Sequence, residues 1–293
     1  MALPGSEPSL GGVEVARGDD AAPDPIAYYT ECWVERFRAG HNPTSLAIHY
    51  GLVDDARIDF ERAKLAINTH VVERLAISRL GEASLVDLGC GVGGTILDLA
   101  SRFSSWRFSG VDRTPASLSF AGSRAAERGY GERVRWIQSD YAATPLSPGF
   151  DGAYAIESAC HCDDKRRLLA EAMRLLRSGA SFVVVDFFRT RRPLDAPARR
   201  RYAELLRGFC VADYYDEELA ALAPAAGFAA TDVEDLTARV LPSVARSADK
   251  ARARLNGDAV GERMRFHLEA CIAVEALCES GHLSYGSFRA TKP

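Results

Sequence analysis

Apolar residues along this chain alternate between the spacing of a strand and the spacing of a helix. Apolar residues three or four positions apart predict helices at 54–80, 115–128, 163–177 and 243–280, the last as one or two helices. Gly81 and Gly179 are expected to end the first and third of these helices. Strands that alternate with helices indicate a parallel sheet with right-handed crossovers. Short apolar runs predict the strands at 85–88, 106–112, 134–139, 150–156, 181–188, 231–240 and 283–290.

The flanking segments depart from this alternation. Residues 1–25 contain few bulky apolar side chains, which predicts a disordered tail. Residues 26–82 are expected to form helical lid or cap elements, and residues 83–293 the main α/β domain. Within that domain, segment 189–226 is expected to be a helical insert over the carboxyl edge of the sheet, where ligands bind in such folds.

Aromatic residues mark the start of the ordered chain. Tyr29, Trp33 and Phe37 recur every four residues and are predicted to share one face of a helix. Such a stripe either packs on the core or forms an aromatic lid over a ligand site. The sequence leaves both interpretations open.

Composition excludes some classes of protein. Apolar residues make up 47% of the 293 residues, enough for a full core, and the net charge of −4 argues against a general nucleic-acid binder. No run approaches the roughly 18 apolar residues of a membrane helix. The N-terminus lacks the pattern of a signal peptide. Seven cysteines without a framework spacing predict reduced thiols and a cytoplasmic protein.

A glycine-rich turn joins the strand at 85–88 to a helix. Gly89 and Gly91 allow the backbone to approach a ligand, and the helix N-terminus offers free N–H groups. Asp87 lies in the strand end, two residues before the first glycine. A carboxylate there repels a pyrophosphate but accepts hydrogen bonds from an ammonium group. S-adenosylmethionine carries an ammonium and a sulfonium and no phosphate, and is therefore the predicted cofactor.

Acidic residues also end the next two strands. Asp112 ends the second strand, where a carboxylate can accept hydrogen bonds from both ribose hydroxyls of a nucleotide. Asp140 follows the third strand. Because the carboxyl ends of parallel strands meet at one edge of the sheet, Asp87, Asp112 and Asp140 are expected to lie in one site.

Glu157 and His161 follow the fourth strand and leave the sheet at the same edge. In an apolar pocket the pKa of Glu157 would rise towards that of a useful base. Glu157 can also simply brace the cofactor or a turn, and the sequence leaves this open. Cys160, His161 and Cys162 are not expected to hold a metal, because adjacent ligands cannot all face one tetrahedral ion.

Six arginines lie just beyond the fifth strand. Runs of this kind usually form a solvated face, but two or three guanidinium groups can also hold a diphosphate. The sequence does not decide between these roles. The cluster consists of Arg189, Arg191, Arg192, Arg199, Arg200 and Arg201.

Four segments together resemble a known family. VDLGCGVGG, IESACHCDDK, LLRSGASFVVVDFF and LAIHYG are similar to segments of bacterial relatives of tocopherol and sterol C-methyltransferases, which are class I S-adenosylmethionine-dependent enzymes. The group includes natural-product methyltransferases that act on isoprenoids and alkaloids. Glu157 and His161 match the E-x-x-x-H spacing of the tocopherol-type enzymes, whereas the Arg-rich insert matches no pattern of the family.

The resemblance implies a fold and a set of site residues. The fold is α/β, with a Rossmann-like seven-stranded, mostly parallel sheet in the order 3-2-1-4-5-7-6 and helical N-terminal and cap elements. The acidic residue after the third strand takes the adenine amino group, and its neighbour's backbone N–H takes a ring nitrogen. Implied cofactor-binding residues are Asp87, Gly89, Cys90, Gly91, Asp112, Arg113, Asp140, Tyr141 and Ile156. Candidate substrate contacts are Tyr28, Tyr29, Trp33, His49 and Tyr50.

The predicted function is methyl transfer to a small hydrophobic molecule. The leading hypothesis is C-methylation of an isoprenoid-like alkene, such as a prenyl diphosphate, with Glu157 and His161 assisting loss of a proton from the resulting carbocation. One alternative is O- or N-methylation of a hydrophobic natural product with His161 as the base. Others are a cofactor-binding subunit without catalysis and an NAD oxidoreductase, which Asp87 disfavours. The sequence leaves open the oligomeric state, a homo-oligomer included, and whether Mg²⁺ accompanies a diphosphate.

Overall fold

The computed structural model describes residues 24–55, 57–211, 213–214, 218–257 and 259–293. The predicted disordered tail therefore lies, as far as residue 23, outside the described residues. Asp24 already belongs to the first helix, because its carboxylate accepts the N–H of Ile26 as an N-cap. Among the described residues, no helix is long and apolar enough to cross a membrane.

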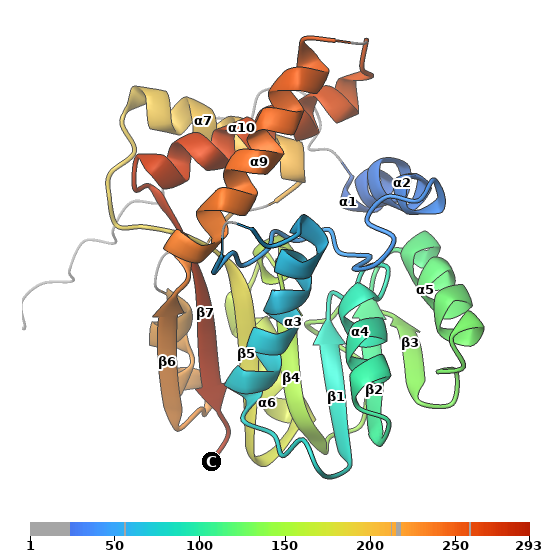
Figure 1. The fold of residues 1–293 in the computed structure, drawn as a ribbon. Helices are drawn as coiled ribbons and strands as arrows, with labels where there is room; N and C mark the ends of the chain where they lie inside the picture. The colour runs from blue at the N-terminus through green and yellow to red at the C-terminus, as the bar shows by residue number, and fades with distance from the viewer. Residues whose placement is uncertain (1–23, 56, 212, 215–217, 258) are drawn as a thin grey trace, which may run out of the picture.

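A seven-stranded sheet forms the centre of the fold, in the predicted order β3-β2-β1-β4-β5-β7-β6. β7 is antiparallel to both of its neighbours, and the remaining pairs are parallel. The carboxyl ends of β1 to β4 consequently meet at one edge (Figure 1). The strands are β1 (Ala83–Leu88), β2 (Trp106–Asp112), β3 (Val134–Gln138), β4 (Phe150–Ile156), β5 (Leu176–Arg189), β6 (Ala230–Asp235) and β7 (Leu283–Thr291).

Helices cover both faces of the sheet (Figure 1). Ile67 and Ile96 pack with Leu85 in one buried cluster, whereas Leu168 packs with Val86 in another. Successive side chains of a strand point to opposite faces, so neighbouring residues of β1 contribute to separate cores. The helices are α3 (Phe60–Leu75) and α4 (Gly94–Arg102) on the first face, α6 (Lys165–Leu175) on the second, and α5 (Pro115–Glu127) beside β2 and β3.

A helical cap stands over the carboxyl ends of the strands (Figure 1). α7 and α10 pack closely, since a Cβ on Gly208 would lie only 2.1 Å from the carbonyl oxygen of Phe266. Only glycine fits this contact without a shift of one helix. The cap consists of α7 (Ala196–Phe209), α9 (Thr237–Leu255) and α10 (Glu262–Glu279), and α8 (Glu218–Leu222) and η3 (Pro224–Ala226) lead from α7 to β6.

The N-terminal aromatic residues lie in a segment that includes a π-helical turn. The ring of Trp33 lies 6.2 Å from the ring of Phe37, and Tyr29 packs against the same buried cluster. Tyr28 and Trp33 both contact the ring of His267, at centroid distances of 6.0 and 5.2 Å, and the ring of Tyr29 lies 5.6 Å from that of His161. The aromatic segment therefore packs on the core, and Tyr29 also reaches His161. The segment comprises α1 (Pro25–Tyr28), η1 (Tyr29–Val34) and α2 (Glu35–Arg38).

The helix predicted at 54–80 is shorter at both ends. The carboxylate of Asp59 accepts the N–H groups of Glu61 and Arg62, so α3 begins there. Ala76 adopts a left-handed conformation, with φ of 54°, and ends the helix. Gly81 is therefore not its C-cap.

Two further boundaries differ from the prediction. Gly179 does not end α6, because β5 already begins at Leu176 and the N–H of Gly179 donates to the carbonyl of Lys292 beyond β7. The strand predicted at 231–240 ends at Asp235. The carboxylate of Asp235 accepts the N–H of Thr237, where α9 begins.

Candidate functional site

A cavity of about 860 Å³ lies between the carboxyl edge of the sheet, the N-terminal segment and the helical cap. It is lined by the ends of β1, β2 and β4, by η1, and by residues of α9 and α10. Every residue that the sequence analysis proposed as a catalytic, cofactor or substrate residue lines this one cavity. Tertiary structure thus brings together candidates from residue 28 to residue 161.

Two of the three acidic residues are largely buried at the sheet edge. Burial raises the pKa of Asp87 well above its ordinary value, and Asp87 forms no ion pair with a basic side chain in the described part of the chain. Asp112 accepts the backbone N–H groups of Gly91 and Thr114, at 2.9 and 2.8 Å. It thereby ties the glycine turn to the start of α5. Burial raises the pKa of Asp112, which these hydrogen bonds partly oppose.

Hydrogen bonds join the glycine turn to the loops after β3 and β4. Gly89 has a φ of 97°, and a Cβ there would lie 2.4 Å from Cβ of Ser158. Ser158 donates its hydroxyl to the carbonyl of Leu88 at 2.6 Å, and Tyr141 donates its hydroxyl to the carbonyl of Ser158 at 2.8 Å. Glycine is required at position 89 because both the conformation and the space exclude a side chain.

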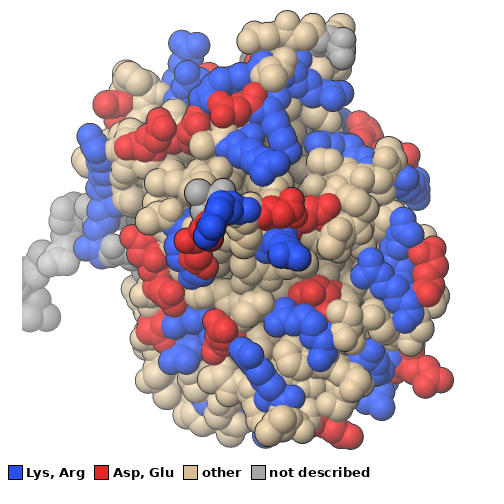
Figure 2. All heavy atoms as spheres, viewed as in Figure 1, with Lys and Arg blue, Asp and Glu red and all other residues tan. Residues whose placement is uncertain are grey.

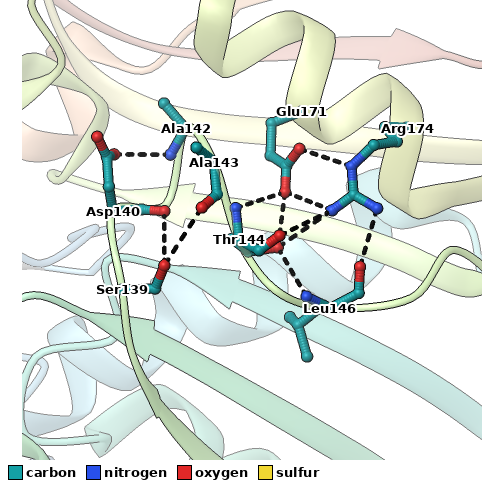
Figure 3. Close-up of polar contacts among 8 residues, drawn as sticks. All are labelled: Ser139, Asp140, Ala142, Ala143, Thr144, Leu146, Glu171 and Arg174. Atoms are coloured by element: carbon teal, nitrogen blue, oxygen red, sulfur yellow. Dashed lines mark hydrogen bonds and ion pairs between the residues drawn. The ribbon is translucent and has the colours of Figure 1, made fainter.

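Glu171 and Arg174 on α6 hold the loop that carries Asp140 (Figure 3). Thr144 donates its N–H and its hydroxyl to Oε1 of Glu171, at 2.8 and 2.6 Å. Arg174 pairs with Glu171 and donates to the carbonyl of Leu146. Burial raises the pKa of Glu171, but these hydrogen bonds outweigh it and lower that pKa overall. The sequence signal for this brace was the spacing of Glu171 and Arg174 on one helix face, which the sequence analysis missed.

Glu157 joins three parts of the fold. Its Oε1 accepts the backbone N–H of Tyr50 at 2.9 Å and the hydroxyl of Tyr285 at 2.8 Å. Burial, and then the nearby carboxylate of Asp186, raises the pKa of Glu157 to about 7. The side chain is therefore divided between its acid and carboxylate forms near neutral pH.

Both ring nitrogens of His161 have hydrogen-bond partners. Nδ1 lies 3.1 Å from the carbonyl oxygen of Cys210 and must carry the proton. Nε2 then accepts the hydroxyl of Tyr29 at 2.7 Å. Burial lowers the pKa of His161 to about 4, so the ring is neutral. Tyr29 thus occupies the basic nitrogen of this candidate base.

His49 has the same tautomer but an unoccupied basic nitrogen. Its Nδ1 lies 2.7 Å from the carbonyl oxygen of Tyr50 and donates to it. Its Nε2 is buried and has no hydrogen-bond partner among the described residues. Burial lowers the pKa of His49 to about 3, which keeps the ring neutral. His49 therefore contributes to the cavity lining a neutral ring whose Nε2 is enclosed and lacks a hydrogen-bond partner among the described residues.

The basic residues of the cavity are not those of the Arg-rich segment. Arg200 and Arg201 pair with Glu204 on the surface of α7. Besides Arg113, the cavity is lined by five Lys or Arg residues that the sequence analysis did not consider. They come from segments far apart in the sequence, so no local pattern announced them. They are Arg36, Lys64, Arg167, Lys250 and Arg254, of which Arg167 lies 3.7 Å from the carboxylate of Asp140.

The structure offers little to a metal ion. Within the described ranges, no group of three or more His, Cys, Asp or Glu side chains is arranged to hold one. Cys160 and Cys162 are free thiols, and burial raises the pKa of each.

Comparison with known proteins gives consistent matches. Residues 85–179 match a family model described as a methyltransferase domain. The chain is 30% identical over 199 residues to the O-methyltransferase cnsE of Penicillium expansum, covering 68% of this chain and 69% of that protein. It is 26% identical over 289 residues to the 27-O-demethylrifamycin SV methyltransferase of Amycolatopsis mediterranei, covering 96% and 97%. A geranyl diphosphate methyltransferase structure superposes with a TM-score of 0.73 at 22% identity, over 92% of this chain and 97% of that one, which shows a common fold.

Proposed function

Because this chain belongs to the class I S-adenosylmethionine-dependent methyltransferases, we propose that it methylates a small hydrophobic acceptor that loses a proton in the reaction. The leading candidate is a carbon of an isoprenoid-like alkene. The observation that carries this proposal is Glu157, a buried carboxyl group with a pKa of about 7 in the wall of the cavity.

S-adenosylmethionine is the cofactor, and the acidic end of the cavity fits it. Asp87, a buried carboxylate without a basic partner in the described structure, suits the cofactor's ammonium group. Asp112 would accept the ribose hydroxyls, Asp140 the adenine amino group, and the backbone N–H of Tyr141 would face an adenine nitrogen. When bound, the cofactor supplies an electrophilic methyl group on a sulfonium.

The protein's own contribution is to position the acceptor, exclude water and take up a proton. An alkene that gains a methyl group becomes a carbocation, which a nearby carboxylate stabilises and deprotonates. Glu157 suits both tasks, because Tyr50 and Tyr285 hold Oε1 and fix the carboxyl group in place. In this scheme Tyr29 and His161 form a hydrogen-bonded wall of the site.

A second candidate is O-methylation. It is favoured by the unpartnered Nε2 of His49, a residue of the cavity lining, which can orient an acceptor hydroxyl by accepting a hydrogen bond from it. It is also favoured by cnsE and the rifamycin-type relative, since both match most of this chain and both names describe methylation of oxygen.

A methyl-transfer assay with ¹³C-methyl-labelled S-adenosylmethionine tests the proposal. One panel contains prenyl diphosphates and prenyl alcohols, and the other contains phenols, hydroxylated polyketides and indoles. Label on a prenyl carbon, located by NMR, is the expected result. Label only on oxygen would instead support the second candidate, and His49→Gln should then abolish transfer while the affinity for S-adenosylhomocysteine is retained. Label only on nitrogen would contradict both.

A further inference from the structure

Basic side chains from three separate segments meet at the cap side of the cavity. Arg36 belongs to α2, Lys64 to α3, and Lys250 and Arg254 to α9. The ammonium groups of Lys64 and Lys250 lie 5.2 and 4.9 Å from the centre of the Phe60 ring. Figure 2 shows basic side chains gathered on the face over α9.

Lys64 has a structural task within this group. It is buried, with 4% of its surface exposed, and its ammonium donates to the carbonyls of Ala47, Ile48 and His49, at 3.0, 3.4 and 2.7 Å. Its three N–H groups are therefore used. Lys64 adds positive charge to the cavity without having a donor left for a ligand.

The other three basic groups have donors to spare. Arg36 lies over the ring of Trp33, 4.7 Å from its centre, and contacts Nε2 of His41 at 3.5 Å. Among the described residues, Arg36, Lys250 and Arg254 form no ion pair with a carboxylate. Burial, and then the charge of Arg254, lowers the pKa of Arg36. These like charges repel one another, so an anion between them would stabilise the arrangement.

We propose that Arg36, Lys250 and Arg254 bind a phosphate or diphosphate group of the methyl acceptor. Guanidinium groups match phosphate oxygens with two parallel hydrogen bonds. Lys250 and Arg254 are exposed, and they lie four residues apart on one face of α9. An anionic head group bound there keeps part of its hydration, while the hydrophobic remainder enters the cavity.

The position of this basic group suits the proposed reaction. That the bound ligand is the methyl acceptor rests on the proposed function. Lys64 binds the carbonyl of His49, and the next N–H along the chain, that of Tyr50, binds Glu157. Arg36, Lys250 and Arg254 belong to the N-terminal segment and the cap, whereas the predicted cofactor residues lie at the sheet edge of the same cavity. A substrate held by its head group would extend past Glu157 towards the methyl donor.

Calorimetric titration with inorganic pyrophosphate tests the proposed site without requiring the true acceptor. The full chain is first saturated with S-adenosylhomocysteine. We expect saturable binding of one pyrophosphate, weakened roughly tenfold for each charge removed by Lys250→Gln and Arg254→Gln. Arg200→Gln is the matched control, since that guanidinium lies on α7 outside the cavity and pairs with Glu204.

The outcomes separate this inference from the proposed function. No saturable binding, or equal weakening by Arg200→Gln, would overturn the phosphate site. Malonate binding as tightly as pyrophosphate would overturn the choice of phosphate in favour of a carboxylate. Unchanged affinity for S-adenosylhomocysteine shows that the variants are folded. If pyrophosphate binds as expected but no prenyl carbon is ever methylated, the anion site stands and C-methylation fails.

Discussion

Glu157 combines an unusual backbone conformation with a partly buried side chain. Its φ of 44° is left-handed, which costs a residue with a side chain on the order of 1–3 kcal/mol. Two hydrogen bonds to Oε1, from Tyr50 and Tyr285, hold the side chain in this position. Strain that is retained at the wall of a cavity is consistent with a functional role for the carboxyl group.

Glu157→Gln should lower kcat by at least about 100-fold, the usual contribution of a general base. The wild-type kcat/KM should fall as the pH drops below about 7, because protonation of Glu157 removes the base, and the variant should lose this dependence. The measurement is a pH series of steady-state rates. Tyr285→Phe is the control, since it removes one hydrogen bond and keeps the carboxylate. Equal losses of turnover and of cofactor affinity would instead make Glu157 a cofactor ligand.

At the scale of elements, the cap depends on close packing of α7 against α10. Cβ of Ala270 and the carbonyl of Phe266 both lie where a side chain on Gly208 would be. α10 carries His267, whose Nδ1 lies 2.8 Å from the hydroxyl of Tyr28. The separation of these two helices therefore also sets the position of the N-terminal segment over the cavity.

Gly208→Ala should destabilise the protein by about 1–3 kcal/mol, the usual cost of overpacking. The measurement is urea unfolding followed by circular dichroism. Gly122→Ala is the matched control, because Gly122 lies inside α5 with its nearest neighbour atom at 3.7 Å from the added Cβ. Alanine should stabilise that helix by up to about 1 kcal/mol. Equal effects of the two substitutions would show that the contact between α7 and α10 is not close.

At the scale of the whole molecule, the cavity gathers titratable groups from every part of the chain. Burial lowers the pKa of four histidines to about 3 or 4, so folding favours their neutral forms. Burial raises the pKa of two carboxyl groups to about 7, so folding favours their protonated forms. Acidification therefore destabilises the fold through the histidines and stabilises it through the carboxyl groups. The histidines are His41, His49, His161 and His267, and the carboxyl groups are Glu157 and Asp186.

Stability should therefore fall on acidification from pH 7 to pH 5.5. At pH 7 the unfolded and folded chains bind about the same number of protons on these groups, whereas at pH 5.5 the unfolded chain binds nearly four on the histidines and the folded chain about two on the carboxyl groups. The net proton uptake on unfolding therefore rises from about zero to about two, which corresponds to an average loss of roughly 1.4 kcal/mol per pH unit. Urea unfolding at several pH values measures this slope. A stability that rises on acidification would show that the carboxyl groups dominate and the histidines are not buried as described.

The sequence by itself determined most of the elements of the sheet and the acidic residues at its edge. Most element positions agree with the prediction because apolar periodicity reports burial along each local segment, and the strand order is the one that the family resemblance implied. Single segments of sequence were also enough to find three acidic residues, because each lies at or just after the end of a parallel strand. These are Asp87, Asp112 and Asp140. The resemblance to class I methyltransferases is confirmed by the comparisons.

Tertiary structure alone decided the acceptor end of the site. Packing of the N-terminal segment places the hydroxyl of Tyr29 on Nε2 of His161, the nitrogen that the sequence had offered as a base. The free nitrogen of His49 depends on a tautomer fixed by one backbone carbonyl. The basic group of Arg36, Lys250 and Arg254 joins segments more than 200 residues apart in the sequence. Such contacts arise from packing between distant elements, which the periodicity of a single segment does not encode.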